Sequence, residues 1–242
     1  MLIREGLERN QAIDIRLACL LGCVAGAMNA AAFFAVGFFS ANMTGNVSTL
    51  SEKLASGSYA AASFYLSILL AFIMGSLLSS LMIATGRKKT RKIYAYALFL
   101  EALFIAVIGA SDLWIASDWR VSIIVLGLAF AMGFQNAVST LISSARVRTT
   151  HVSGLITDIG IEISGLIASL GKSGSRERAL YLTNLQLHLV TCGSFLAGGI
   201  AGVLLYRFMG GYLQLLTAMA LLTLSLLTIT NPDSPVPEQI SG

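Results

Sequence analysis

Six long stretches of this chain are apolar enough to cross a lipid bilayer. A helix needs about 20 apolar residues to span the hydrocarbon core, and none of the six contains a Lys or Arg apart from Arg120 at one edge. They cover residues 17–39, 60–84, 93–115, 120–142, 180–206 and 212–230. With only 12% charged residues, the chain also lies far from soluble domains, which are about a quarter charged. We therefore expect an all-α membrane protein with six transmembrane helices.

The basic residues predict its orientation. If the N-terminus is inside, 13 of the 16 Lys and Arg residues fall in inner segments, as the positive-inside rule requires, so both termini should be cytoplasmic. The same rule accounts for the net charge of +4 without nucleic-acid binding. An eight-span arrangement would place the basic cluster at 87–92 outside. A seven-span arrangement is weaker but stays open, because residues 152–171 could cross, re-enter or lie on the membrane.

One sequence pattern occurs twice. GAMNA at 26–30 is followed, after an apolar stretch, by ANMTGN at 41–46, and GFQNA at 133–137 is followed by THVSGL at 150–155. A second match supports this alignment, because Phe72 and Phe195 each stand three residues before a Gly. Three spans per unit would turn the second unit upside down, so we predict a 3+3 inverted repeat.

The predicted units follow from this division. The first repeat covers 17–116 and the second 117–230, with a cytoplasmic segment at 1–16 and a disordered cytoplasmic tail at 231–242.

The segments after the first and fourth spans are rich in hydroxyl, amide and Gly residues, so we expect broken or re-entrant segments there. Non-helical backbone is tolerated at membrane depth only where protein buries it or water lines it. The N-terminus of a following half-helix attracts polar or anionic groups. Ordinary loops that cap the next helix are the alternative, and the amides could instead join helices. The candidate substrate-binding residues are Asn29, Asn42, Thr44, Gly45, Asn46, Gln135, Asn136, Ser153 and Gly154.

Ionisable residues inside spans are functional candidates by default. Glu101 and His188 are candidates for proton coupling, because a carboxyl in hydrocarbon could carry a proton and histidine shuttles protons near neutral pH; hydrogen bonding to a neighbouring helix is the rival role. Asp158 and Glu162 are four residues apart and share one face of a helix. We favour a surface position for that helix, with these two carboxylates on its wet side.

The run NAAAFFAVGFFSANMTGNVSTL, together with AMGFQNAV and the TT-x-V-SG that follows it, resembles the YoaK-like bacterial inner-membrane proteins, a domain of unknown function. The similarity extends from about residue 15 to residue 230, and ANMTGN is its most specific element. It implies a polytopic protein of the bacterial inner membrane and supplies no substrate.

A transporter of a small polar or anionic solute explains these features best, with a channel or a structural or regulatory membrane protein as alternatives. No metal-binding or nucleophile motif is visible, so we expect no enzyme activity, metal or cofactor. The partners expected are the bilayer, the solute and, through Gly-rich helix faces such as Gly198, Gly199 and Gly202, a second copy of the chain. A transporter predicts that one cavity gathers a specific set, namely Asn29, Thr44, Asn46, Asn136, Ser153 and Glu101. A scaffold predicts separate sites.

Overall fold

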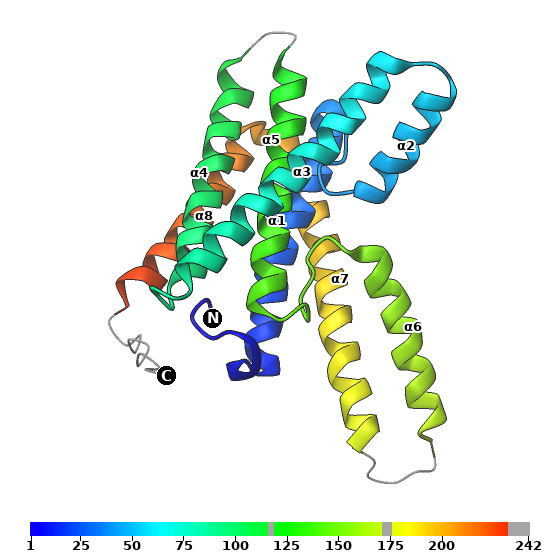
Figure 1. Ribbon diagram of the computed structural model, residues 1–242, viewed down its shortest axis with the longest axis vertical. Helices are drawn as coiled ribbons and strands as arrows, with labels where there is room; N and C mark the ends of the chain where they lie inside the picture. Colours follow the sequence, from blue (N-terminus) through cyan, green and yellow to red (C-terminus); the bar gives the residue numbers. More distant parts are fainter. Residues whose placement is uncertain (116–118, 171–175, 232–242) are drawn as a thin grey trace.

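The computed structural model describes residues 1–115, 119–170 and 176–231, and these fold into eight α-helices with no β-strand among them (Figure 1). A short 3-10 turn at Gly6–Glu8 precedes them. The helices are α1 (Gln11–Val36), α2 (Met43–Ala55), α3 (Tyr59–Gly86), α4 (Ile93–Trp114), α5 (Trp119–Ile142), α6 (Val152–Ala168), α7 (Arg176–Met209) and α8 (Tyr212–Thr230).

Six helices are long and apolar enough to cross a membrane, namely α1, α3, α4, α5, α7 and α8. They coincide with the six predicted spans, so the prediction of an all-α, multi-pass membrane protein is confirmed. The helices α2 and α6 have 13 and 17 residues, fewer than the roughly 20 that a span requires. The proposed boundary between the two units at 116/117 lies outside the described residues, as does all of the proposed tail at 231–242 except residue 231.

The first span begins earlier than hydropathy predicts, at Gln11 rather than at residue 17. Asn10 caps the helix, because its side-chain oxygen accepts a hydrogen bond from the Ile13 N–H at 3.0 Å. Capping by Asn satisfies one of the N–H groups that a helix start leaves free. The first two turns, which contain Asp14 and Arg16, can therefore be helical, although a hydropathy window does not detect them.

The helices from the two parts of the chain pack in pairs: α1 lies against α7, α3 against α5, and α4 against α8. The first two pairs are in backbone contact at glycines. A Cβ atom on Gly26 would overlap the main-chain carbonyl oxygen of Phe195, and one on Gly133 would overlap that of Phe72. Gly198, part of the small-residue face considered above for oligomers, likewise meets the Cys23 carbonyl. This face therefore makes contacts within the chain.

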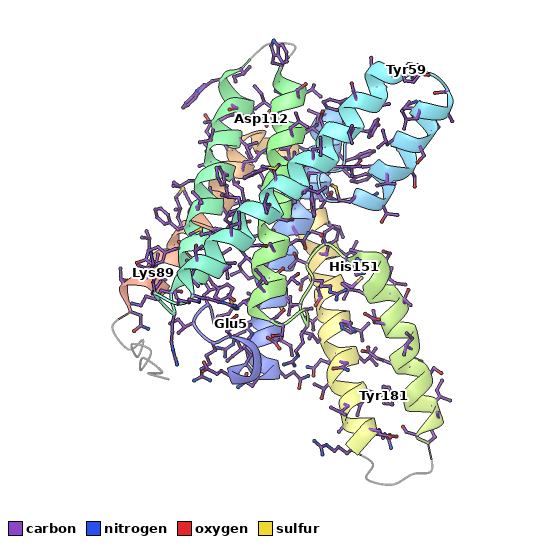
Figure 2. The ribbon with its side chains drawn as sticks, viewed as in Figure 1. Glu5, Tyr59, Lys89, Asp112, His151 and Tyr181 are labelled. Atoms are coloured by element: carbon purple, nitrogen blue, oxygen red, sulfur yellow. The ribbon has the colours of Figure 1, made fainter. Side chains whose placement is uncertain are left out.

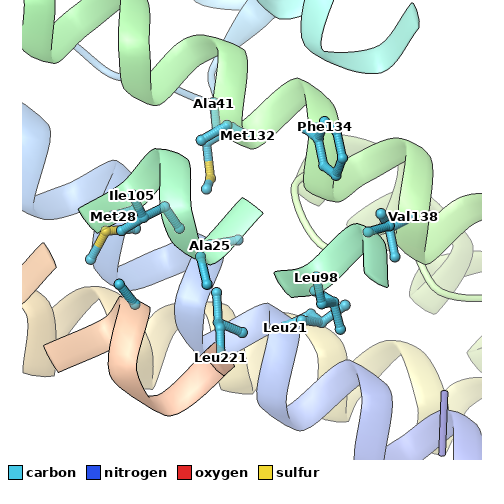
Figure 3. Packing of buried hydrophobic residues seen from close by; sticks show 14 of the residues in the cluster. Leu21, Ala25, Met28, Ala41, Leu98, Ile105, Met132, Phe134, Val138 and Leu221 are labelled. Carbon is cyan, nitrogen blue, oxygen red and sulfur yellow. The ribbon is translucent and has the colours of Figure 1, made fainter. Parts of the chain in front are cut away.

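The core lies between α1, α4, α5 and α8 (Figure 3). Leu21, Met28, Leu98, Met132 and Phe134 are completely buried there. The outer surface is also apolar, as contact with lipid tails requires. On α3, for example, the exposed large side chains include Leu66, Leu70, Ile73, Leu77 and Leu81.

Three segments that carry basic residues lie near one end of the bundle. Asp14 of α1 lies 2.6 Å from Nε of Arg9 and 2.9 Å from Nη1 of Arg146, which belongs to the α5–α6 connection. Lys92, at the start of α4, donates to the carbonyl of Ile229 near the end of α8 at 2.7 Å. Figure 2 shows Glu5 toward this end, with Asp112 and Tyr59 toward the opposite one.

Candidate functional site

A cavity of about 770 Å³ lies between the starts of α2 and α6 and the middle parts of α1, α3, α5 and α7. Its volume is within the range of small-molecule binding sites. The lining residues are Asn29, Phe39, Ala41, Asn42, Met43, Thr44, Gly45, Ser48, Phe72, Asn136, Thr140, Arg148, Thr150, His151, Val152, Ser153 and Phe195. Both copies of the repeated motif therefore contribute to the same cavity.

Asn29 brings the chain back alongside α1. Its Oδ1 accepts a hydrogen bond from the main-chain N–H of Ala41 at 2.8 Å, and both residues are buried. Asn29 is seven residues from the end of α1 at Val36, which corresponds to about 10 Å along a helix. The segment after α1 therefore doubles back, so that α2 begins beside α1 rather than beyond its end.

Asn42 caps the N-terminus of α2, and its side chain lies against Gly45. Its side-chain oxygen accepts from the N–H of Gly45 at 3.1 Å. A Cβ atom on Gly45 would approach the Asn42 amide nitrogen to 2.5 Å, so a larger residue would push the capping side chain away. Asn46 is buried and donates from Nδ2 to the carbonyl of Phe39 at 3.4 Å. It supports the returning segment but does not line the cavity.

The second motif forms the facing wall by a similar arrangement. Asn136 of α5 donates from Nδ2 to the Thr150 hydroxyl, and its Oδ1 accepts from the Thr149 hydroxyl at 3.4 Å. The segment before α6 is therefore tied to α5, as the segment before α2 is tied to α1. A Cβ atom on Gly154 would overlap the ring of His151, just as one on Gly45 would crowd Asn42. In both motifs, the glycine of the hydroxyl-Gly pair thus leaves room for the side chain of the residue just before the helix, Asn42 in the first and His151 in the second.

The predicted substrate-binding residues divide into two groups. Six of the nine line the cavity: Asn29, Asn42, Thr44, Gly45, Asn136 and Ser153. The other three, Asn46, Gln135 and Gly154, are not among its lining residues. Gln135 is fully buried and donates from Nε2 to the Leu21 carbonyl at 3.2 Å, so it joins α5 to α1.

Several lining residues were missed from the sequence, chiefly Arg148, His151 and the two phenylalanines Phe72 and Phe195. Three of these residues carried a signal in the sequence. His151 occupies the place in the second motif that Asn42 has in the first, and Phe72 and Phe195 are repeat-related. Arg148 was interpreted only as a topology-setting charge.

The cavity lining is electropositive. Among the described residues that line it, the ionisable ones are Arg148 and His151, and none is a carboxylate. Both are exposed rather than packed away. The starts of α2 and α6 add the partial positive charge of helix N-termini. Such a lining favours solutes that carry negative charge or hydrogen-bond acceptors.

A family model for DUF1275, a protein of unknown function, matches residues 17–228. The chain belongs to this family. The resemblance to YoaK-like proteins is consistent with this match. No curated protein and no solved structure shows detectable similarity to the chain.

Glu101 does not join the cavity in this DUF1275 protein. It lies in α4, completely buried, and neither carboxyl oxygen has a hydrogen-bond partner among the described residues. The expectation that it would converge with the motif residues is therefore wrong. Sequence spacing gives its depth in the helix, whereas the rotation of α4 determines which neighbours it faces.

His188 also lies away from the cavity. Its Nδ1 is 3.0 Å from Oε1 of Glu162, which connects α7 to α6. The interpretation of Glu162 as part of a wet helix face is wrong, because this residue is only 5% exposed. The outward side of α6 is apolar instead, with Ile156, Ile161 and Ile167 about 60% exposed.

A second buried polar cluster, around Asp112, was not predicted. Its Oδ1 lies 2.5 Å from Nη2 of Arg120, and its Oδ2 accepts from the Tyr206 hydroxyl at 2.7 Å. Gln214 adds a longer bond of 3.4 Å. The cluster joins α4, α5, α7 and α8. Within the described ranges, no three His, Cys, Asp or Glu residues come together in a possible metal site, and the three cysteines are free thiols.

Proposed function

We propose that this protein is a carrier for a small polar or anionic solute in the bacterial inner membrane rather than an enzyme. One observation carries the proposal: Asn29 and Thr44 from the first motif line the same cavity as Asn136 and Ser153 from the second. A scaffold would need no shared polar cavity, because each amide could be satisfied by a neighbouring helix. Convergence of two distant motifs on one space instead supports binding of a solute between them.

Reciprocal packing supports the inverted repeat that such a carrier needs. Gly26 meets the Phe195 carbonyl, and the equivalent glycine of the second unit, Gly133, meets the carbonyl of the equivalent phenylalanine, Phe72. Gly75 against Phe130 and Gly198 against Cys23 form a second equivalent pair. Exchanging the two units thus reproduces the same contacts, as a pseudo-two-fold axis would. Carriers with inverted repeats commonly bind their substrates at the interface between the repeats.

In this proposal α2 and α6 are re-entrant half-helices that enter from opposite sides of the membrane and begin at the cavity. In Figure 1, α2 and α6 extend away from their starts in opposite directions, each alongside the helix that follows it. The apolar outward side of α6 suits contact with lipid. The gathering of Arg9, Lys92 and Arg146 near one end of the bundle supports a cytoplasmic location for that end.

Proton coupling through Glu101 completes the proposal. An unpaired ionised carboxylate is costly inside a membrane and usually marks a functional site. Because Glu101 is not among the residues that line the cavity, we propose that it acts on the helix arrangement rather than on the solute. The pair formed by His188 and Glu162 then serves to hold α6 on α7.

Flux into proteoliposomes tests the carrier proposal. A panel of labelled anionic, neutral and cationic solutes would be offered with and without an imposed pH gradient. We expect saturable uptake of at least one solute, loss of uptake in Asn136→Ala, and loss of the pH-gradient dependence alone in Glu101→Gln. Thr223→Val is the matched control, because this exposed hydroxyl bonds only within its own helix. Absence of flux for every solute with folded protein would exclude the carrier.

A further inference from the structure

Asn29 directs an unused hydrogen-bond donor toward the cavity. The residue is only 8% exposed, and its Oδ1 is occupied by the Ala41 N–H. This bond fixes the orientation of the amide, because a main-chain N–H requires an acceptor. The Nδ2 group is therefore the part left for the cavity, and it has no acceptor among the described residues. This nitrogen is not among the side-chain atoms that are buried without a partner, so it is open to an occupant of the cavity, which can supply the acceptor.

Arg148 adds a full positive charge to the same lining. Arg9, Arg120 and Arg146 each lie within 3 Å of a carboxylate oxygen. Arg148 has no carboxylate partner in the described parts of the chain, and it lines the cavity beside His151. A guanidinium group binds carboxylates with two parallel hydrogen bonds. The polar side of the cavity therefore suits a carboxylate better than a neutral amide or an ammonium group.

The apolar part of the lining includes three aromatic rings. Phe72 and Phe195 come from the two packed helix pairs, and Phe39 lies on the segment before α2. Aromatic rings favour apolar or flat groups through their large contact area. A solute with one charged end and one apolar end would thus meet complementary surfaces at both ends.

We propose that the cavity binds a small organic monocarboxylate, with the carboxylate at Asn29 and Arg148 and the apolar part between Phe72 and Phe195. This inference deepens the proposed carrier function and rests on it for its physiological meaning. The binding itself does not require that the protein moves its ligand.

Equilibrium binding to the full-length protein in detergent tests the proposal. The probes are labelled benzoate and butyrate, with benzamide and benzylamine as neutral and cationic competitors of similar shape. We expect saturable binding of a carboxylate probe and at least tenfold weaker competition by benzamide and benzylamine, because charge-assisted hydrogen bonds are about twice as strong as neutral ones. Arg148→Gln should weaken the binding by tenfold or more.

Lys88→Gln is the matched control, since it removes an exposed positive charge outside the cavity and should leave the affinity unchanged. Absence of binding by both carboxylates, equal competition by benzamide, or equal losses in the Arg148 and Lys88 variants would overturn the inference. Flux of neutral or cationic solutes without carboxylate binding would support the carrier proposal and exclude the anion preference. Carboxylate binding without any flux would support the anion preference and exclude the carrier.

Discussion

Asn29 and Ala41 lie twelve residues apart in the chain and are joined by a buried 2.8 Å hydrogen bond. The bond sets the point at which the chain, having left α1, returns to its side. In the second motif, the bond from Asn136 to the hydroxyl of Thr150 stands in the same place. The position of both cavity walls therefore depends on two repeat-related asparagines.

Replacing Asn29 by Ala should destabilise the protein by about 1–3 kcal/mol, because the N–H of Ala41 would lose its acceptor while remaining buried. Thermal unfolding in detergent measures the change. Ser48→Ala is the control, since its hydroxyl lines the same cavity but bonds only to the Thr44 carbonyl within α2, and it should change stability by less than about 0.5 kcal/mol. Equal effects of the two substitutions would argue against a structural role for the Asn29 bond.

Two glycines of α7 should respond differently to substitution by Ala. At Gly198 the added Cβ would overlap the main chain of Cys23, whereas at Gly193 nothing lies within 4 Å. We expect Gly198→Ala to cost about 1–3 kcal/mol through overpacking. Gly193→Ala should be neutral or slightly stabilising, because Ala favours helix. Denaturation of the two purified variants under the same conditions compares them, and a neutral Gly198→Ala would contradict the close α1–α7 contact.

Asp112 and Tyr206 should be energetically coupled. Asp112→Asn weakens the bonds to both Arg120 and the Tyr206 hydroxyl, and we expect a loss of about 1–3 kcal/mol. The figure stays below that of a fully buried ion pair, because the Arg120 side chain is 35% exposed. A double-mutant cycle with Tyr206→Phe should yield an interaction energy of at least about 0.5 kcal/mol. Strict additivity would mean that the cluster does not act as a unit.

The contact between Glu162 and His188 should hold α6 against α7. Glu162→Ala removes the carboxylate that lies 3.0 Å from Nδ1 of His188, so local opening of α6 should become more frequent. Hydrogen exchange followed by mass spectrometry would detect faster exchange in α6. Asp158→Ala, one turn earlier on the same helix, serves as comparison. Unchanged exchange in α6 of the Glu162 variant would show that the pair does not stabilise the helix.

Hydropathy predicted all six spanning helices because a membrane imposes a length and an apolar composition on each of them. The errors lie at helix ends, as at Gln11, where a capping side chain extends a helix into polar sequence. The repeated motif also identified Asn29, Thr44, Asn136 and Ser153, all of which line the cavity.

Other features depend on contacts that no local pattern encodes. Arg148 reaches the cavity only because the chain turns back after α5. In the sequence alone, this residue cannot be distinguished from an ordinary basic residue of a loop. Glu101 points into the core because α4 packs with that side against its neighbours. Asp112 bonds to Tyr206 across 94 residues of sequence, and a carboxylate within a span gives no indication of which distant residue will be its partner.

The most direct test of the account is a cross-link between the two motifs within one chain. After replacement of Cys19, Cys23 and Cys192 by Ala, a Thr44→Cys, Ser153→Cys variant would be treated in native membranes with a short bifunctional maleimide. Because both positions line one cavity, we predict efficient intramolecular cross-linking, and little in a Thr44→Cys, Leu170→Cys control beyond the far end of α6. Failure of the Thr44 and Ser153 pair to cross-link, or equal yields in both variants, would contradict a shared cavity.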